Sequence, residues 1–186
     1  MLTEDKMVCF IILLTAFIFT PAMAQTILFD DFTDKPAERW EFITDQVMGG
    51  VSTGNVSFMT EKGTSYARMT GTVSLQNNGG FIQFRRRVTS QFEKSKQGLE
   101  LKLRGNKQQY FVHIRTTGTF LPWQYYHAPL SSNSDWTIVR MPFSVFERSS
   151  GFLSKKITAK NIRSVGIVAF GKEHEVQLDV KQISIF

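Results

Sequence analysis

Apolar and polar residues alternate through most of the chain beyond residue 26, as in β-strands that bury one face. The clearest run is 99–104, where leucines alternate with charged residues, and 110–115 alternates in the same way. Further strands are expected at 27–32, 51–60, 66–73, 81–88, 123–128, 136–143, 163–170 and 176–186. A single helical turn is suggested at 158–162. About ten short strands without a long helix predict an all-β fold, a β-sandwich of antiparallel sheets.

The polar segment 105–109 between the two clearest strands predicts a hairpin. If Leu103 pairs with Val112, the apolar side chains of both strands share one face, because side chains alternate with a period of two. The opposite face then carries a basic and aromatic set: Lys102, Arg104, Phe111 and His113. We expect that face to be a candidate binding surface.

Two glycine pairs interrupt the strand pattern, Gly49-Gly50 and Gly79-Gly80. Glycine pairs allow a positive φ or a close backbone approach that a Cβ would forbid. The candidate binding residues combine these loops with nearby strand and aromatic positions: Asp45, Met48, Gly49, Gly50, Ser52, Asn77, Asn78, Arg104, His113, Arg115, Trp123 and Tyr125. Alternatively, the Asp and Asn side chains stabilise the loops by bonding to backbone and bind nothing else.

The N-terminal segment has the features of a secretory signal peptide. Residues 7–19 are almost wholly apolar, and Ala22-Met23-Ala24 forms a small-x-small cleavage pattern before Gln25. The apolar run is too short to span a bilayer as a helix. We therefore expect residues 1–24 to be removed and residues 25–186 to form one exported domain, periplasmic or secreted.

Charge and cysteine content limit the possible partners of this expected domain. The whole chain has 22 Lys and Arg and 16 Asp and Glu; without Glu4, Asp5 and Lys6, 21 and 14 remain, a net charge of +7. The remaining 162 residues contain no cysteine, so a hydrophobic core must hold the fold. Such a positive domain could approach anionic lipid, lipopolysaccharide or acidic polymers, or the charge could serve solubility alone.

Arg85-Arg86-Arg87 does not favour nucleic-acid binding. Alternation sends Arg86 to the opposite face from its neighbours, so the run forms no continuous basic patch. We expect no nucleic-acid partner.

Trp123 and Tyr125 are expected to share one face, with Tyr126 on the other. Exposed rings of this kind stack on sugar faces or anchor a protein partner, whereas buried rings belong to the core. Period-2 alternation alone does not decide which face is buried. Trp123 and Tyr125 are therefore candidate binding residues.

No catalytic motif stands out. Gly50-Val-Ser-Thr-Gly54 matches Gly-x-Ser-x-Gly, but a nucleophile elbow needs a strand–turn–helix and here the serine leads into another strand. Asp135 and His174 could complete a triad only on paper. The three histidines lack metal-ligand spacing. We therefore expect no enzymatic activity.

Several motifs taken together resemble the complex I intermediate-associated protein 30 family. They are Trp40 ahead of Asp45-x-Val-Met-Gly-Gly-Val-Ser52, Gly71-x-Val-Ser74, Asn77-Asn-Gly-Gly-Phe81, Leu101-x-Leu-Arg-Gly105 with Tyr110, and Trp136-x-x-Val-x-Met-Pro-Phe143 with Phe146. The resemblance spans nearly all of residues 25–186. It implies a galactose-binding-like jelly roll, the architecture of many carbohydrate-binding modules.

The resemblance also implies a function. The family's mitochondrial members help to assemble respiratory complex I and are not enzymes. This chain departs from them because it has an export signal where they have an Arg-rich transit peptide. We expect a non-catalytic binding or assembly module, monomeric or weakly associated, that acts on a protein partner in or at a membrane. The alternative is a carbohydrate-binding module for envelope or extracellular glycans.

The same fold resemblance suggests a cofactor. Jelly-roll carbohydrate modules often hold a structural calcium near their first and last strands, where this chain has Asp30, Asp31 and Asp179. Carboxylates together with loop carbonyls could supply the several oxygen ligands that calcium needs. The alternative is that these acids cap turns. No other cofactor is expected.

Overall fold

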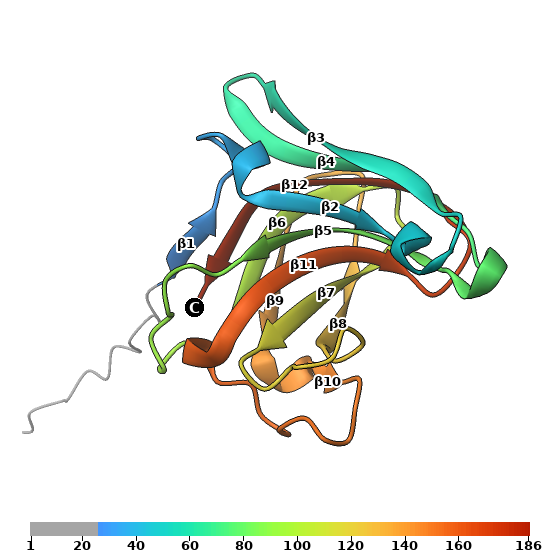
Figure 1. The fold of residues 1–186 in the computed structure, drawn as a ribbon. Coiled ribbons are helices and arrows are strands. Elements are labelled where there is room, and N and C mark those ends of the chain that lie inside the picture. Colours follow the sequence, from blue (N-terminus) through green and yellow to red (C-terminus); the bar gives the residue numbers. More distant parts are fainter. Residues whose placement is uncertain (1–25) are drawn as a thin grey trace, which may run out of the picture.

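The computed structural model describes residues 26–186 and shows two antiparallel sheets packed face to face (Figure 1). Sheet A has the spatial order β3-β4-β12-β6-β9, with β1 also paired to β12, and sheet B has the order β10-β8-β7-β11-β5-β2. The strands are β1 (Ile27–Asp30), β2 (Trp40–Thr44), β3 (Thr53–Glu61), β4 (Thr64–Val73), β5 (Phe81–Arg87), β6 (Gly98–Gly105), β7 (Gln109–Thr116), β8 (Tyr126–Ser131), β9 (Thr137–Pro142), β10 (Glu147–Arg148), β11 (Ile162–Phe170) and β12 (His174–Ile185). The all-β sandwich is confirmed. The predicted signal peptide, residues 1–24, lies outside the described residues.

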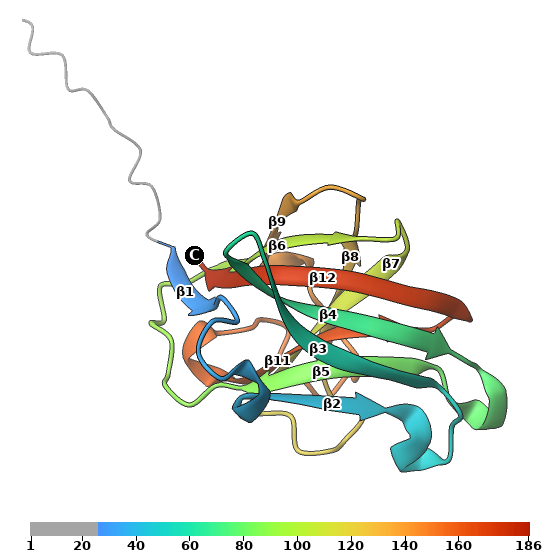
Figure 2. The ribbon, with the colours of Figure 1, turned by 90° about the horizontal axis from the view of Figure 1, so that it is seen from above.

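Short 3-10 turns join the strands: η1 (Pro36–Glu38), η2 (Asp45–Met48), η3 (Gln76–Asn78), η4 (Phe143–Val145) and η5 (Ala159–Asn161). The last of these is the helical turn expected near residue 160. Figures 1 and 2 both show η2 and η3 side by side at one end of the sandwich, although about 30 residues separate them in sequence. Asn77 Nδ2 bridges them by donating to the carbonyl of Gly49 at 3.3 Å.

The core lies between the two inner faces, as the alternation predicts. Sheet A contributes Leu99, Leu101 and Leu103, sheet B contributes Val112 and Ile114, and all five are fully buried. Burying each of these side chains stabilises the fold by about 1.5–3 kcal/mol relative to exposure. The core therefore holds the sandwich together without a disulfide, because the described residues contain no cysteine.

The predicted hairpin between β6 and β7 is wrong. Strand β6 pairs with β12 and β9 in sheet A, whereas β7 pairs with β11 and β8 in sheet B. Leu103 and Val112 thus belong to different sheets that face each other across the core. Alternation fixes only which side chains point inward, and two strands of opposite sheets satisfy that condition as well as two paired strands do. The expected common surface is therefore split between the two outer faces of the molecule.

Other strand predictions are close to the structure, with two corrections. Strands β2 and β10 were not predicted; β2 is a five-residue edge strand that pairs with β5, and β10 is a two-residue edge strand that pairs with β8. Strand β8 begins at Tyr126, so Trp123 and Tyr125 lie in the preceding loop and not in a strand. Tyr126 nevertheless points into the core, opposite to Tyr125, as alternation predicts. Pro142 ends β9, because proline has no backbone N–H to donate to the ladder.

Candidate functional site

A cleft of about 640 Å³ lies over the outer face of sheet B. Its floor comes from alternate residues of three adjacent strands: Gln83 and Arg85 of β5, His113 and Arg115 of β7, and Ser164, Gly166, Val168 and Phe170 of β11. Its walls come from the η2 and η3 loops on one side and from the loop before β8 on the other, with Val47, Met48, Asn78, Pro122, Trp123 and Tyr125. The cleft is therefore built where loops distant in sequence rise around one sheet face.

Asp45 holds the two glycine loops together from beneath. Its side chain is fully buried and accepts hydrogen bonds from Ser52 N at 3.0 Å, Ser52 Oγ at 2.5 Å, Gly80 N at 2.6 Å and Phe81 N at 3.3 Å. Burial acts to raise the pKa of Asp45, but the donors outweigh it and the pKa lies below its usual value. Asp45 is thus an ionised anchor that fixes the position of both loops.

This anchor explains the glycines. A Cβ on Gly50 would lie 2.3 Å from Asp45 Cγ, and one on Gly79 would lie 2.4 Å from Asp45 Oδ2. Gly49 is left-handed, with φ of +88°, where it ends η2. Asp45, Gly50 and Ser52 therefore form the scaffold of the candidate site, while Met48, with 66% of its surface exposed, reaches solvent at the rim.

Ser52 does not have the environment of a nucleophile. It is fully buried, its hydroxyl donates to Asp45, and it also accepts from the backbone N–H of Ser74 at 3.0 Å. A nucleophile elbow instead presents its hydroxyl to substrate at the top of a strand–turn–helix. The Gly-x-Ser-x-Gly pattern at this position is part of the loop scaffold.

Aromatic rings form the wall of the cleft next to β7. Trp123 exposes 64% of its surface, and Tyr125 stacks on His113 with ring centres 4.2 Å apart and planes 11° apart. Burial, with a smaller effect of nearby His127, lowers the pKa of His113 to about 3, so its ring is neutral at pH 7. The wall thus offers one exposed indole beside a packed, uncharged stack.

The loop that carries Trp123 is fixed by hydrogen bonds. Gln124 Oε1 accepts from the backbone N–H groups of Phe120 and Leu121, and Arg115 Nη2 donates to the Leu121 carbonyl at 2.7 Å. The carbonyl of Trp123 accepts from Ser149 Oγ at 2.9 Å. The indole is therefore held in place without being covered.

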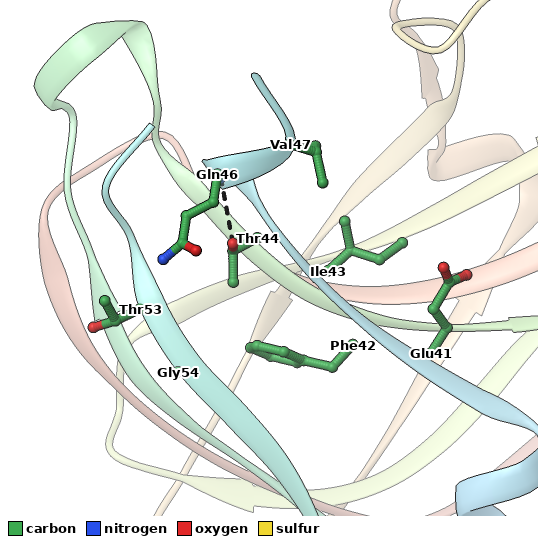
Figure 3. Close-up of a pocket in the computed structure, with 8 residues that line it drawn as sticks. All are labelled: Glu41, Phe42, Ile43, Thr44, Gln46, Val47, Thr53 and Gly54. Carbon is green, nitrogen blue, oxygen red and sulfur yellow. Dashed lines mark hydrogen bonds between the residues drawn. The ribbon is translucent and has the colours of Figure 1, made fainter. Parts of the chain in front are cut away.

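A second, more open groove of about 750 Å³ continues from the cleft past the edge strand β2 toward β3. Ile43 and Val47 line both the cleft and this groove. Figure 3 shows these two side chains close together on one side of β2, with Gln46 and Thr44 on the other. An extended ligand in the cleft could therefore continue along this edge of the sandwich.

The predicted site residues separate into three groups. The cleft collects Met48, Asn78, His113, Arg115, Trp123 and Tyr125. Asp45, Gly49, Gly50, Ser52 and Asn77 belong to the loop scaffold beneath or beside it. Arg104 lies elsewhere, on the outer face of sheet A, where it binds Asp179 and Glu61, so the prediction that it shares a surface with His113 is wrong.

Sequence reasoning missed several cleft residues: Gln83, Arg85, Ser164, Gly166 and Phe170. Alternation places Arg85 opposite to Arg86, and the structure confirms this, since Arg86 bonds to Asp30 near the core. The alternation of β11 is hidden because both its faces are largely buried. The available signal was the alternation of β5. It shows which side chains of β5 point outward, but it does not show that a cleft lies over that face.

The candidate calcium ligands are engaged with other groups. Asp30 binds Arg39 and Arg86 and accepts from Trp40 Nε1 at 2.7 Å. Asp179 binds Arg68 and Arg104, and Asp31 accepts from Thr33 in a turn. Within residues 26–186, no three acidic, histidine or cysteine side chains gather in a way that could hold a metal ion. The calcium site stays an untested prediction that these contacts do not favour.

Among residues 26–186, no helix is long and apolar enough to cross a bilayer.

Similar solved structures include carbohydrate-binding modules. The family 11 module of the cellulosomal cellulase Lic26A-Cel5E of Clostridium thermocellum has a TM-score of 0.69 and 12% identity, covering 87% of this chain and 94% of that one. The family 11 module from the same organism in complex with a β-1,3-1,4-mixed-linked tetrasaccharide has a TM-score of 0.68 and 12% identity, covering 87% and 95%. A family 4 module has a TM-score of 0.51 and 15% identity, covering 87% and 94%. At these identities the likeness shows the jelly-roll fold alone.

The sequence itself identifies the family. A search of curated protein sequences finds no match. The family profile of complex I intermediate-associated protein 30 matches residues 30–180, which include both glycine loops, the Asp45 anchor and most strands of the two sheets. The chain belongs to the complex I intermediate-associated protein 30 family.

Proposed function

We propose that this domain is a non-catalytic binding module that holds an oligosaccharide in the cleft over sheet B. The observation that carries the proposal is the exposed Trp123 indole beside a floor of hydrogen-bonding side chains. A sugar ring has apolar faces that pack on aromatic rings and hydroxyl groups that exchange hydrogen bonds with Gln83, Asn78 or Ser164. The cleft supplies both kinds of contact within one space.

Two further observations support this proposal. The described residues that line the cleft include no carboxylate, whereas glycoside hydrolysis commonly uses a flanking pair. A structure of the same fold was determined with a mixed-linked tetrasaccharide bound, which shows that this architecture can serve glycan recognition. With the expected signal peptide, the ligand would be met in the cell envelope or outside the cell.

Replacing Trp123 by Ala is expected to weaken oligosaccharide binding about tenfold or more, because the stacking platform is lost. The measurement is isothermal titration calorimetry with a panel of neutral and acidic oligosaccharides. Phe152→Ala is the matched control, since Phe152 is 97% exposed and does not line the cleft. Absence of binding across the whole panel by the unmodified protein would overturn the proposal.

A protein partner at a membrane or envelope is the second candidate function. Family membership supports it, and so does the apolar rim of the cleft, where Val47 and Met48 expose 71% and 66% of their surface on the wall opposite Trp123. Exposed apolar patches mark protein interfaces, and methionine adapts to varied partner shapes.

Met48→Glu tests that second candidate, because a charge at the rim would oppose apolar docking without disturbing the core. The measurement is crosslinking of the chain without residues 1–24 in its own cell envelope, followed by recovery and mass spectrometry. Recovery of one membrane-protein complex, reduced about tenfold by Met48→Glu and unchanged by Met59→Glu on sheet A, supports a protein partner. Recovery of glycan without a dominant protein supports the first proposal.

A further inference from the structure

The floor of the cleft has a hollow between two arginines. Strand β11 runs between β5 and β7, and at the level of the arginines it presents only Ser164 and Gly166. Arg85 is the cross-strand partner of Gly166, and Arg115 is that of Ser164. Both arginines line the cleft, and the small residues between them leave a space that no side chain of β11 fills. The Gln83 side chain borders this space, with Oε1 3.3 Å from where a Cβ on Gly166 would lie.

The positive charge of this hollow is only partly balanced. Arg85 Nη2 binds Glu41 Oε2 at 3.0 Å, at the exposed edge of the sheet. Arg115 is joined to no carboxylate of the described residues and uses one N–H to bond the Leu121 carbonyl. Burial, and then the charge of Arg85, lower the pKa of Arg115, which indicates that the two guanidinium groups are close enough to repel.

The remaining donors suit an anion. A guanidinium group carries five N–H donors. In both Arg85 and Arg115, one of these donors has a hydrogen-bond partner among residues 26–186. Planar guanidinium donors match carboxylate, sulfate and phosphate oxygens in paired hydrogen bonds. A concave surface lined by one sign of charge also concentrates ligands of the opposite sign.

We infer that the saccharide bound in the cleft is acidic, and that its carboxylate, sulfate or phosphate group sits between Arg85 and Arg115. The inference rests on the proposed function, which it narrows from oligosaccharides in general to anionic ones. Trp123 then contacts the sugar ring, while the arginines select the charged substituent. The anion also relieves the repulsion between the two guanidinium groups.

The test compares ligands that differ only in charge. The intact domain is titrated with a galacturonic acid tetrasaccharide and its fully methyl-esterified, neutral form, and with a sulfated galactan oligosaccharide and its desulfated form. At least one anionic member is expected to bind about tenfold more tightly than its neutral counterpart, as one charge-assisted hydrogen bond allows. That preference is also expected to fall as salt is raised from about 50 mM to about 300 mM.

Variants assign the preference to the two arginines. Arg115→Gln and Arg85→Gln are each expected to reduce the ratio of anionic to neutral affinity about tenfold. Lys102→Gln, on the outer face of sheet A, removes the same charge away from the cleft and should leave the preference intact. If Arg115→Gln disturbs the Trp123 loop, Arg85→Gln still tests the inference, because Arg85 does not hold that loop.

The outcomes separate the two proposals. Equal binding of neutral and anionic forms, reduced by Trp123→Ala but not by either arginine variant, overturns this inference and leaves the oligosaccharide proposal standing. An anionic preference that Lys102→Gln reduces as much as Arg115→Gln also overturns it, since the effect would come from overall charge. Failure of every saccharide to bind overturns both.

Discussion

Replacing Asp45 by Asn is expected to lower the free energy of unfolding by about 3 kcal/mol or more, although the two side chains have nearly the same shape. Asp45 Oδ1 accepts from Ser52 N, while Oδ2 accepts from Ser52 Oγ, Gly80 N and Phe81 N. An amide has one oxygen and one NH₂ group, so in either orientation a donor would face a donor. Unsatisfied buried donors carry the full cost of their lost solvation.

Chemical denaturation followed by tryptophan fluorescence measures this effect. Asp31→Asn is the control, because Asp31 is only half-buried and bonds Thr33 two residues away, so this change should alter stability by less than about 1 kcal/mol. If Asp45→Asn were as stable as the unmodified chain, the charge of the carboxylate would not be what holds the loops. The same variant should weaken ligand binding, since Met48 and Asn78 stand on the loops that Asp45 joins.

Asp45 also shows what could be predicted from sequence about the site. An acidic residue before a glycine pair predicts a loop whose backbone needs a local partner, and that role is what the structure shows. The hydrogen bond to Gly80, 35 residues further on, could not be predicted, because it depends on η2 and η3 meeting at one end of the sandwich. Sequence patterns are local, whereas this contact is set by topology.

The pairing of the strands also could not be predicted from local sequence patterns. Alternation in 99–104 and 110–115 correctly assigns the inward-facing side chains of β6 and β7. It assigns the wrong partner, because both strands face one shared core from opposite sheets, and their parity matches that of a hairpin. Because of this wrong pairing, Arg104 was predicted to lie on the surface that carries His113. Arg85 lies on a strand with the same kind of alternation, but it was not predicted as a site residue.

The depth of the cleft also could not be predicted from the sequence. The hollow between Arg85 and Arg115 exists because Gly166 has no side chain and Ser164 has a small one, and because the Trp123 loop rises beside β7. A glycine within a strand can mark a bulge, a bend or a close approach, and only the packing of neighbours decides among them. The cleft therefore follows from cross-strand neighbours that the linear sequence does not reveal.

Stability of the domain is expected to fall as the pH is lowered from 7 to 5, with His113 as the main cause. Its folded pKa of about 3 lies below its unfolded value of about 6.5, so between these values the unfolded chain binds more protons and low pH favours unfolding. The stabilisation is fully present above about pH 6.5, and about 2 kcal/mol is lost on reaching pH 5. This window lies above the usual pKa of aspartate, about 3.9, so Asp30 and Asp45 add little to the change.

His113→Phe separates this effect from other acid effects, because phenylalanine keeps the stack on Tyr125 and cannot take up a proton. The free energy of unfolding, measured by urea denaturation at both pH values, should change about 2 kcal/mol less in His113→Phe than in the unmodified chain. Tyr125→Phe, which keeps both the stack and the imidazole, should retain the full dependence. An unchanged pH dependence in His113→Phe would show that the imidazole can be protonated in the folded state. The wall of the cleft beside Trp123 would then gain positive charge near pH 6, and anionic ligands would bind more tightly there at that pH than at pH 8.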